Sequence, residues 1–506
     1  MGIDPGLRRL ALHTLLAAFA GTSPPAWARE LLADGLAGYT LFGANVADRD
    51  QAARLTAELR SVRPDVLVAT DEEGGDVTRL AHRTGSPYPG NAALGAVDDP
   101  DLTRAIYAAI GQELAAAGIN LDLAPTVDVN TAEDNPVIGT RSFGANPAHV
   151  ARHAAAAVHG LQSAGVAACA KHFPGHGATL VDSHLALPTV DVPPEILRER
   201  DLPPFAAVIA AGARAIMTAH IRIPALTRTD PATFSAAVLR DLLRRECGFT
   251  GAIITDALEM EGAREAAGGI GPAAVRALAA GADLLCIGAR VDAGLVERVA
   301  AEIVTAVGDG RLDRRRLEDA ASRTAELAAW TARRAPTRQP ELSSDVTASD
   351  SQSSSQSPSQ SPDCAALGYV AARRAVRVEG SLADLADPLV VQFVAGHSIP
   401  EGRMLWGLSP HLTSTEQVIV EPSDISRERL TAQAGSRPIV VVGRHLHRTE
   451  ETRALIESLG AHHAVTVVEM GWPSRWRPAG VRAFVTTFGA SHANGRAAAE
   501  ALGLVR

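Results

Sequence analysis

A glycine-rich segment, KHFPGHG, carries Lys171, the only lysine among the 48 lysine and arginine residues of the chain. An ammonium group is compact and its donors rotate, whereas a guanidinium is a broad planar fork, so the two exchange freely only where geometry is unimportant. The single lysine therefore reflects either drift within an arginine-biased composition or a position that requires the smaller cation, and the composition favours the second explanation. Pro174 and the neighbouring glycines exclude a helix here and favour a loop that leaves a strand.

The same loop offers an acid–base pair. Asp182 and His184 are separated by one residue, and alternate residues of an extended segment project to the same side. A carboxylate that holds one ring nitrogen raises the proton affinity of the imidazole and leaves the other nitrogen for acid–base work near neutral pH. Together with His172 and His176 these residues could instead bind a metal or merely bond to backbone. Their spacing matches no zinc pattern and Lys171 would repel a cation, so we predict neither a metal site nor a cofactor.

Further charged residues follow apolar runs elsewhere in the chain. In IITDALEM, Asp256 could act as a nucleophile or as an electrostatic stabiliser, although an aspartate at this point also often caps a helix. DEEGGDVTRL begins with Asp71 and contains Arg79, and VIGTRSFG contains Arg141. Carboxylates, arginines and a lysine without a phosphate-binding loop suit a polyhydroxylated ligand. Each arginine taken alone is more often part of a surface salt bridge.

Short apolar runs that alternate with Ala- and Arg-rich helical stretches must position these side chains. The runs span residues 35–43, 65–75, 119–129, 165–175, 213–221, 250–258 and 281–288. Such runs are typical of parallel strands buried on both faces, and about seven or eight such units in about 300 residues indicate a (β/α)8 TIM-like barrel. The carboxyl ends of barrel strands meet at one face, which carries the active site. The polar residues that follow the runs are Asp71, Asp128, Lys171, His172, His220 and Asp256.

A tract rich in serine, glutamine and proline divides the chain and has a composition typical of a linker. We predict a barrel domain over residues 1–340, a linker over 341–364 and a smaller α/β C-terminal domain over 365–506, so the whole chain is of the α/β class. The last part shows strand-like runs but neither a phosphate loop nor a paired-acid motif. We expect it to be mainly structural or interface-forming.

Composition excludes several classes of partner. The net charge is −9 and no basic block occurs, so we expect no nucleic-acid partner. No apolar run reaches about 18 residues, so we expect no membrane partner. Four cysteines without a CxxC pair favour reduced thiols and a cytoplasmic location. The N-terminal segment imitates a signal peptide, but His13 and Thr14 interrupt it. We expect an amphipathic first helix that ends at Pro24 and Pro25.

Taken together, the motifs resemble the family 3 glycoside hydrolases, specifically the bacterial β-N-acetylglucosaminidases of peptidoglycan recycling. They occur in family order over roughly residues 38–290, and KHFPGHG followed by DSH is the most specific of them. The matching stretches are TLFGANV, DEEGGDVTRL, LDLAPTVDV, NPVIGTRSFG, KHFPGHG, MTAHI and ITDALEM. The resemblance implies a retaining enzyme that removes terminal β-linked GlcNAc from muropeptides or related glycosides.

The resemblance also implies a role for individual residues. Asp256 would be the nucleophile that forms a glycosyl-enzyme, and His184 paired with Asp182 would be the acid/base in place of the usual carboxylate. The residues that bind the sugar in the −1 site would be Asp71, Arg79, Arg141, Lys171 and His172. Glu72 and Asp76 depart from the family pattern, in which glutamine and arginine are common.

Three alternatives stay open. A neutral imidazole repels an anion less than a carboxylate does, so phosphate could replace water and make the protein a phosphorylase. A different family 3 β-glycosidase is disfavoured by the DSH motif, because β-glucosidases of the family usually take their acid/base from the second domain. A non-catalytic sugar-binding protein would not need Asp256, Asp182 and His184. The oligomeric state, including a homodimer, is also left open.

Overall fold

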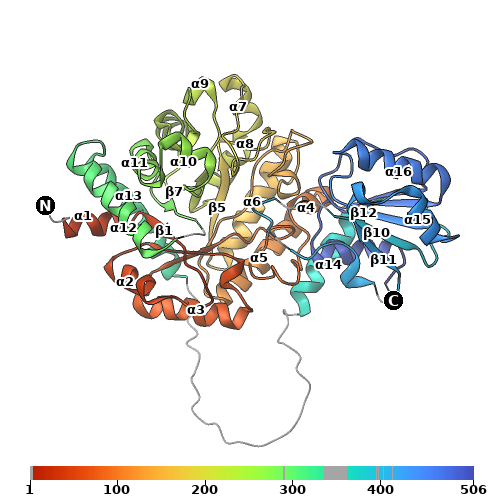
Figure 1. Cartoon of the computed structure of the whole chain (residues 1–506). Coiled ribbons are helices and arrows are strands. Elements are labelled where there is room, and N and C mark those ends of the chain that lie inside the picture. Colours follow the sequence, from red (N-terminus) through yellow and green to blue (C-terminus); the bar gives the residue numbers. More distant parts are fainter. Residues whose placement is uncertain are drawn as a thin grey trace, which may run out of the picture.

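The computed structural model describes residues 4–288, 291–334, 362–394, 396, 398–402, 404–412 and 414–505. These residues form one sheet of eight strands and a second sheet of six, each with its own helices (Figure 1). No helix among them is both long and apolar enough to cross a bilayer. Most of the predicted linker, residues 341–364, lies outside the described residues, and its last three residues belong to helix α14 (Pro362–Ala375).

Parallel strands form the first sheet in the order β7-β6-β5-β4-β3-β2-β1-β8. A further parallel bridge between Ile254 and Leu284 joins β7 to the segment that enters β8 and closes the ring. All strand residues are buried, as expected where helices cover the outer face and side chains fill the interior. The predicted barrel is confirmed. Its strands are β1 (Leu15–Ala17), β2 (Gly38–Leu41), β3 (Leu67–Thr70), β4 (Leu121–Asp122), β5 (Ala167–Phe173), β6 (Ala215–Thr218), β7 (Ala252–Thr255) and β8 (Leu285–Cys286).

Helices surround this barrel (Figure 1). Several begin at side-chain caps: Asp48, Asp99 and Asn146 each accept a hydrogen bond from the backbone N–H three residues further on. The helices are α1 (Pro5–Leu12), α2 (Ala26–Asp34), α3 (Arg49–Val62), α4 (Asn91–Val97), α5 (Pro100–Ala116), α6 (Pro147–Ser163), α7 (Pro194–Arg200), α8 (Leu202–Ala210), α9 (Pro224–Thr227), α10 (Glu261–Ala267), α11 (Ile270–Ala280), α12 (Ala293–Gly308) and α13 (Arg314–Ala332), with a π-helix at Ala237–Glu246.

The prediction of one long first helix is wrong. Helix α1 ends at Leu12, and the apolar run after it forms strand β1 instead. Leu16 of this strand pairs with Gly38 of β2 on one side and with Cys286 of β8 on the other. Burial between two parallel neighbours outweighs the helix propensity of an alanine- and leucine-rich segment.

The second sheet has the strand order β11-β10-β12-β13-β14-β9, with β9 antiparallel to β14 and the other pairs parallel. This arrangement confirms the predicted smaller α/β unit. Its strands are β9 (Arg377–Gly380), β10 (Leu389–Phe393), β11 (Gln417–Val420), β12 (Ile439–Gly443), β13 (Val465–Glu469) and β14 (Ala483–Thr486). Its helices after α14 are α15 (Arg427–Ala434), α16 (Glu450–His462) and α17 (His492–Ala501).

A buried ion-pair cluster joins the second unit to the barrel. Asp76, in the loop after β3, accepts hydrogen bonds from the Arg444 guanidinium at 3.1 Å and from the Ala490 backbone N–H at 2.8 Å. The Thr140 hydroxyl donates a third bond to it at 2.7 Å. Arg444 in turn binds Glu401 at 2.6 Å. Burial raises the pKa of Asp76, and Arg444 opposes that rise. The departure from the family pattern at position 76 therefore has a partner in the second unit.

Replacing Arg444 by methionine is expected to reduce the free energy of unfolding by about 3–5 kcal/mol, because two buried carboxylates then share no cation. Denaturant unfolding of the full chain measures the loss. Arg374→Ala is the control, since Arg374 and Asp99 form a half-exposed pair across the same interface and such pairs contribute about 0.2–1 kcal/mol. Equal losses in the two variants would show that the buried cluster contributes no more to the free energy of unfolding than the half-exposed pair does.

Candidate active site

A cavity of about 620 Å³ lies at the carboxyl ends of the barrel strands. Its wall includes residues that follow β2, β3, β4, β5, β7 and β8, together with Met217 of β6 and the segment 399–402 of the second unit. The predicted site residues in its lining are Asp71, Arg79, Arg141, Lys171, His172, His184 and Asp256. Asp182 lies behind His184 and lines a neighbouring crevice of about 610 Å³ between the two units. The structure thus brings all eight predicted residues to one face of the barrel.

Lys171 is the cation of a buried charge network. Its ammonium lies 2.7 Å from Asp71 Oδ1 and 2.8 Å from Glu73 Oε1. Arg141 binds both oxygens of Glu73, at 2.7 and 2.9 Å. Although burial opposes ionisation, Arg141 and Lys171 hold the pKa of Glu73 well below its usual range, and Asp71 and Glu73 raise the pKa of Lys171. Glu73 is not among the predicted site residues, although it lies two residues after Asp71 in the same motif.

Lys171→Arg is expected to destabilise the protein by about 1–3 kcal/mol and to reduce activity, because a planar guanidinium must fit a position only 2% exposed. The free energy of unfolding and kcat/KM are the measurements. Arg104→Lys is the matched control, because its side chain is 61% exposed in an ion pair with Asp101, and no measurable change is expected. A Lys171→Arg variant with the stability and activity of the original protein would contradict the size argument.

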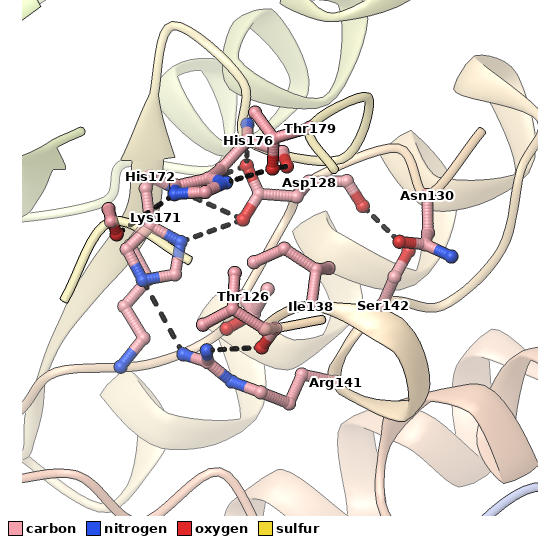
Figure 2. A network of polar contacts seen from close by, with 12 residues as sticks. Thr126, Asp128, Asn130, Ile138, Arg141, Ser142, Lys171, His172, His176 and Thr179 are labelled. Atoms are coloured by element: carbon pink, nitrogen blue, oxygen red, sulfur yellow. Dashed lines mark hydrogen bonds and ion pairs between the residues drawn. The ribbon is translucent and has the colours of Figure 1, made fainter. Parts of the chain in front are cut away.

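His172 is oriented by the carboxylate of Asp128 (Figure 2). Its Nδ1 lies 2.7 Å from Asp128 Oδ2, and its Nε2 lies 3.4 Å from the Arg141 guanidinium. Asp128 also accepts the backbone N–H of His176 at 2.6 Å, and the His172 and His176 imidazoles keep its pKa low despite burial. Asp128 was recognised at a strand end but was not assigned to the site. The structure shows that it holds the KHFPGHG loop in place.

His176 supports the loop that carries the Asp–His pair. Its Nδ1 lies 2.7 Å from the Thr179 hydroxyl and its Nε2 lies 3.0 Å from the Ser183 hydroxyl. Burial and the neighbouring His172 lower the pKa of His176 to about 4, so the ring is neutral at physiological pH. Both of its nitrogens are therefore used for positioning the next turn of the loop.

The Asp–His pair and Asp256 complete the chemistry of the cavity. His184 Nδ1 lies 2.7 Å from Asp182 Oδ1, and the backbone N–H of His184 donates to the same oxygen at 2.9 Å. Burial would raise the pKa of Asp256, but the imidazoles of His220, His172 and His184 lower it to about 2. The cavity thus contains the ionised carboxylate of Asp256 and the imidazole of His184, which is held by the carboxylate of Asp182.

His220 positions the residue that follows Asp256. It is fully buried, and its Nε2 lies 3.1 Å from the carbonyl oxygen of Ala257 while its Nδ1 lies 2.8 Å from the Thr233 hydroxyl. The Ala257 backbone N–H donates to Asp256 Oδ1 at 2.8 Å. Burial lowers the pKa of His220, and the ring positions Asp256 through the backbone of the loop that follows β7.

The second unit contributes part of the cavity wall. Ile399, Pro400, Glu401 and Gly402 line it, and Arg79 donates to the Pro400 carbonyl at 2.8 Å. The sequence contained no signal for this contribution, because the segment has no recognisable motif and meets the cavity only through the packing of the two units. The C-terminal unit is thus an interface-forming part of the site as well as a structural one.

Residues 16–327, more than half of the chain, match the N-terminal domain of glycosyl hydrolase family 3. The chain belongs to glycosyl hydrolase family 3. This family 3 chain is 36% identical over 332 residues to beta-hexosaminidase A of Pseudoalteromonas piscicida, a match that covers 60% of the chain and 55% of that protein. It is 40% identical over 272 residues to the beta-hexosaminidase of Neisseria meningitidis serogroup C, covering 52% and 74%.

A solved structure extends the likeness of this family 3 chain to the second unit. The family 3 beta-N-acetylglucosaminidase of Paenibacillus sp. strain FPU-7 superposes with a TM-score of 0.85 at 31% sequence identity. The superposition covers 99% of this chain and 97% of that one. Both sheets, and not the barrel alone, therefore belong to an arrangement that occurs in the family.

Proposed function

We propose that this family 3 glycoside hydrolase removes terminal β-linked N-acetylglucosamine from its substrates with retention of configuration, through a glycosyl-enzyme on Asp256. The observation that carries the proposal is the pairing, in one cavity, of an ionised aspartate with a histidine whose Nδ1 is held by Asp182. The names of the beta-hexosaminidase relatives and of the Paenibacillus enzyme support the choice of sugar. Peptidoglycan fragments are the substrates that we infer, and a cytoplasmic location stays a prediction.

In the first step Asp256 attacks the anomeric carbon while His184 gives a proton to the departing oxygen. The bond to the aglycone breaks as the bond to Asp256 forms, and the aglycone leaves as an alcohol. In the second step the neutral imidazole takes a proton from water, which attacks the anomeric carbon and releases Asp256. Asp182 stabilises the imidazolium that exists before the first step and after the second. Because the pKa of Asp182 is lowered by its hydrogen bonds from His184, against the effect of burial, it supplies this charge throughout the neutral range.

The charge network of the cavity supplies the sugar-binding groups. Asp71 accepts from Lys171 with one oxygen and keeps capacity for a second donor, such as a sugar hydroxyl. Arg79, Arg141 and His172 lie in the same wall, and Glu73 holds Arg141 in place. We propose that Lys171 acts partly by donating to sugar hydroxyls and partly by fixing Asp71. The residues are thus already positioned by one another before a sugar binds.

Hydrolysis of a 4-nitrophenyl β-N-acetylglucosaminide tests the proposal, with and without phosphate and with EDTA in a parallel sample. EDTA-resistant release of GlcNAc is the expected result. GlcNAc 1-phosphate as the main product would make the protein a phosphorylase that uses the same residues. Activity on a β-glucoside alone would show that the assigned sugar is wrong. Folded protein without turnover on any of these substrates would overturn the proposed function.

A further inference from the structure

A second cluster of histidine and aspartate side chains lies outside the catalytic cavity. His149 and His153 are four residues apart on helix α6, so both rings lie on the same face of the helix. Asp98, the residue that ends helix α4, faces them. One ligand atom from each of the three residues lies within 4.8 Å of the other two.

The distances in this cluster suit a tetrahedral cation better than hydrogen bonds. Asp98 Oδ1 lies 3.3 Å from His149 Nδ1 and 3.4 Å from His153 Nε2. Charge-assisted hydrogen bonds are usually about 2.7–2.9 Å long. Zinc bonds of about 2.0–2.1 Å in a tetrahedron place neighbouring ligand atoms about 3.3–3.4 Å apart. The two separations from Asp98 therefore match edges of a zinc coordination shell, and all three ligand atoms lie within 4.8 Å of one another.

His153 is held in place by a group that is not itself a ligand. The Thr103 hydroxyl lies 2.8 Å from His153 Nδ1 and 3.3 Å from the Asp99 carbonyl oxygen, so a relay from Nδ1–H through the hydroxyl to the carbonyl leaves Nε2 with its lone pair. A Cβ on Gly95 would lie 1.8 Å from the Phe143 carbonyl oxygen and 3.2 Å from His149 Nε2, so glycine at this position lets helix α4 approach the backbone of Phe143 closely.

We propose that Asp98, His149 and His153 form a zinc-type divalent cation site that joins helix α4 to helix α6. Water would complete the tetrahedron. The same turn of the chain contacts the second unit, since Arg377 donates to the Ala96 carbonyl at 2.7 Å and Arg374 binds Asp99 at 2.9 Å. The cation would thus stabilise a corner of the barrel on which the second unit rests.

Arg152 competes with the cation. Its guanidinium lies 2.9 Å from Asp98 Oδ1 and 3.4 Å from His149 Nδ1, and its side chain is 53% exposed. The arginine can therefore swing into solvent when a cation binds. Because displacing such a surface ion pair costs little, Arg152→Ala is expected to tighten cation binding by only about 1.4- to five-fold.

Equilibrium dialysis of the full chain against zinc, with elemental analysis, gives the stoichiometry, and the visible spectrum of the cobalt(II) form reports a tetrahedral site. About one zinc per chain is expected, together with a higher Tm. The His149→Ala/His153→Ala variant is expected to lose this zinc and the cobalt spectrum, whereas His159→Ala, an exposed histidine on the same helix, keeps both. Thr103→Val is expected to weaken binding by about 10- to 100-fold.

Asp98→Asn guards against a variant that merely fails to fold, because asparagine tolerates the left-handed conformation of this residue (φ 55°). Loss of zinc in this folded variant is the expected result. Absence of zinc binding in the original protein would overturn the proposal and leave an Arg152–Asp98 ion pair. Zinc retained by the double histidine variant would also overturn it and would move the cation to another site, such as the catalytic cavity.

Discussion

Replacing Asp256 by alanine is expected to reduce kcat/KM by about 10⁴-fold or more, with no loss of folded protein. The aspartate follows β7 in the cavity and stays ionised because three imidazoles lower its pKa to about 2. Alanine removes the carboxylate oxygen with which the protein is proposed to bond to the anomeric carbon. Steady-state kinetics with the 4-nitrophenyl substrate measures the loss, and circular dichroism checks the fold.

A small external nucleophile distinguishes a lost nucleophile from a distorted site. Azide can enter the space left by Asp256→Ala and attack the anomeric carbon, so restored release of 4-nitrophenol with a glycosyl azide of inverted configuration is expected. Glu259→Gln is the matched control, since Glu259 lines the same cavity and accepts the Gly288 backbone N–H at 2.8 Å. Its kcat/KM is expected to fall by less than about tenfold. Near-normal turnover by Asp256→Ala would refute the assignment.

Replacing His184 by alanine is expected to have an effect that depends on the leaving group. General acid catalysis contributes about 10²–10⁴-fold, and a poor leaving group requires all of it. For an alkyl β-N-acetylglucosaminide, kcat/KM is therefore expected to fall by about that factor. For the 4-nitrophenyl substrate, whose leaving group needs little protonation, the loss in kcat/KM is expected to stay below about tenfold. An equal loss on both substrates would show that His184 is not the acid.

Asp182→Asn tests the partner of His184. The side chain keeps its size but loses the charge that supports the imidazolium, so a smaller loss of kcat/KM is expected, about 10- to 100-fold. Both Asp182 and Asp256 have lowered pKa values, so both are ionised from pH 5 to pH 8 and the kcat/KM profile is expected to show no titration of either carboxylate in this range.

The sequence by itself was enough for the features that depend on near neighbours. Apolar runs between helical stretches predicted the barrel, because a parallel strand buried on both faces must be apolar along its length. Asp182 and His184 are two residues apart, so their contact was visible in the local pattern and appears in the structure at 2.7 Å. The strand ends converge in any barrel, which is why Asp71, Lys171 and Asp256 could be placed in one site.

Tertiary structure alone decided the contacts between distant parts of the chain. Asp76 and Arg444 are 368 residues apart, and no pattern near either residue in the sequence predicts their contact. The same is true of the segment 399–402, which enters the cavity wall only because the two units pack together. Strand β1 looked helical because its alanine and leucine suit both structures, and only its pairing with β2 and β8 selects a strand. Local pattern encodes which face of an element is buried, whereas the identity of the group that covers it depends on the packing of the whole chain.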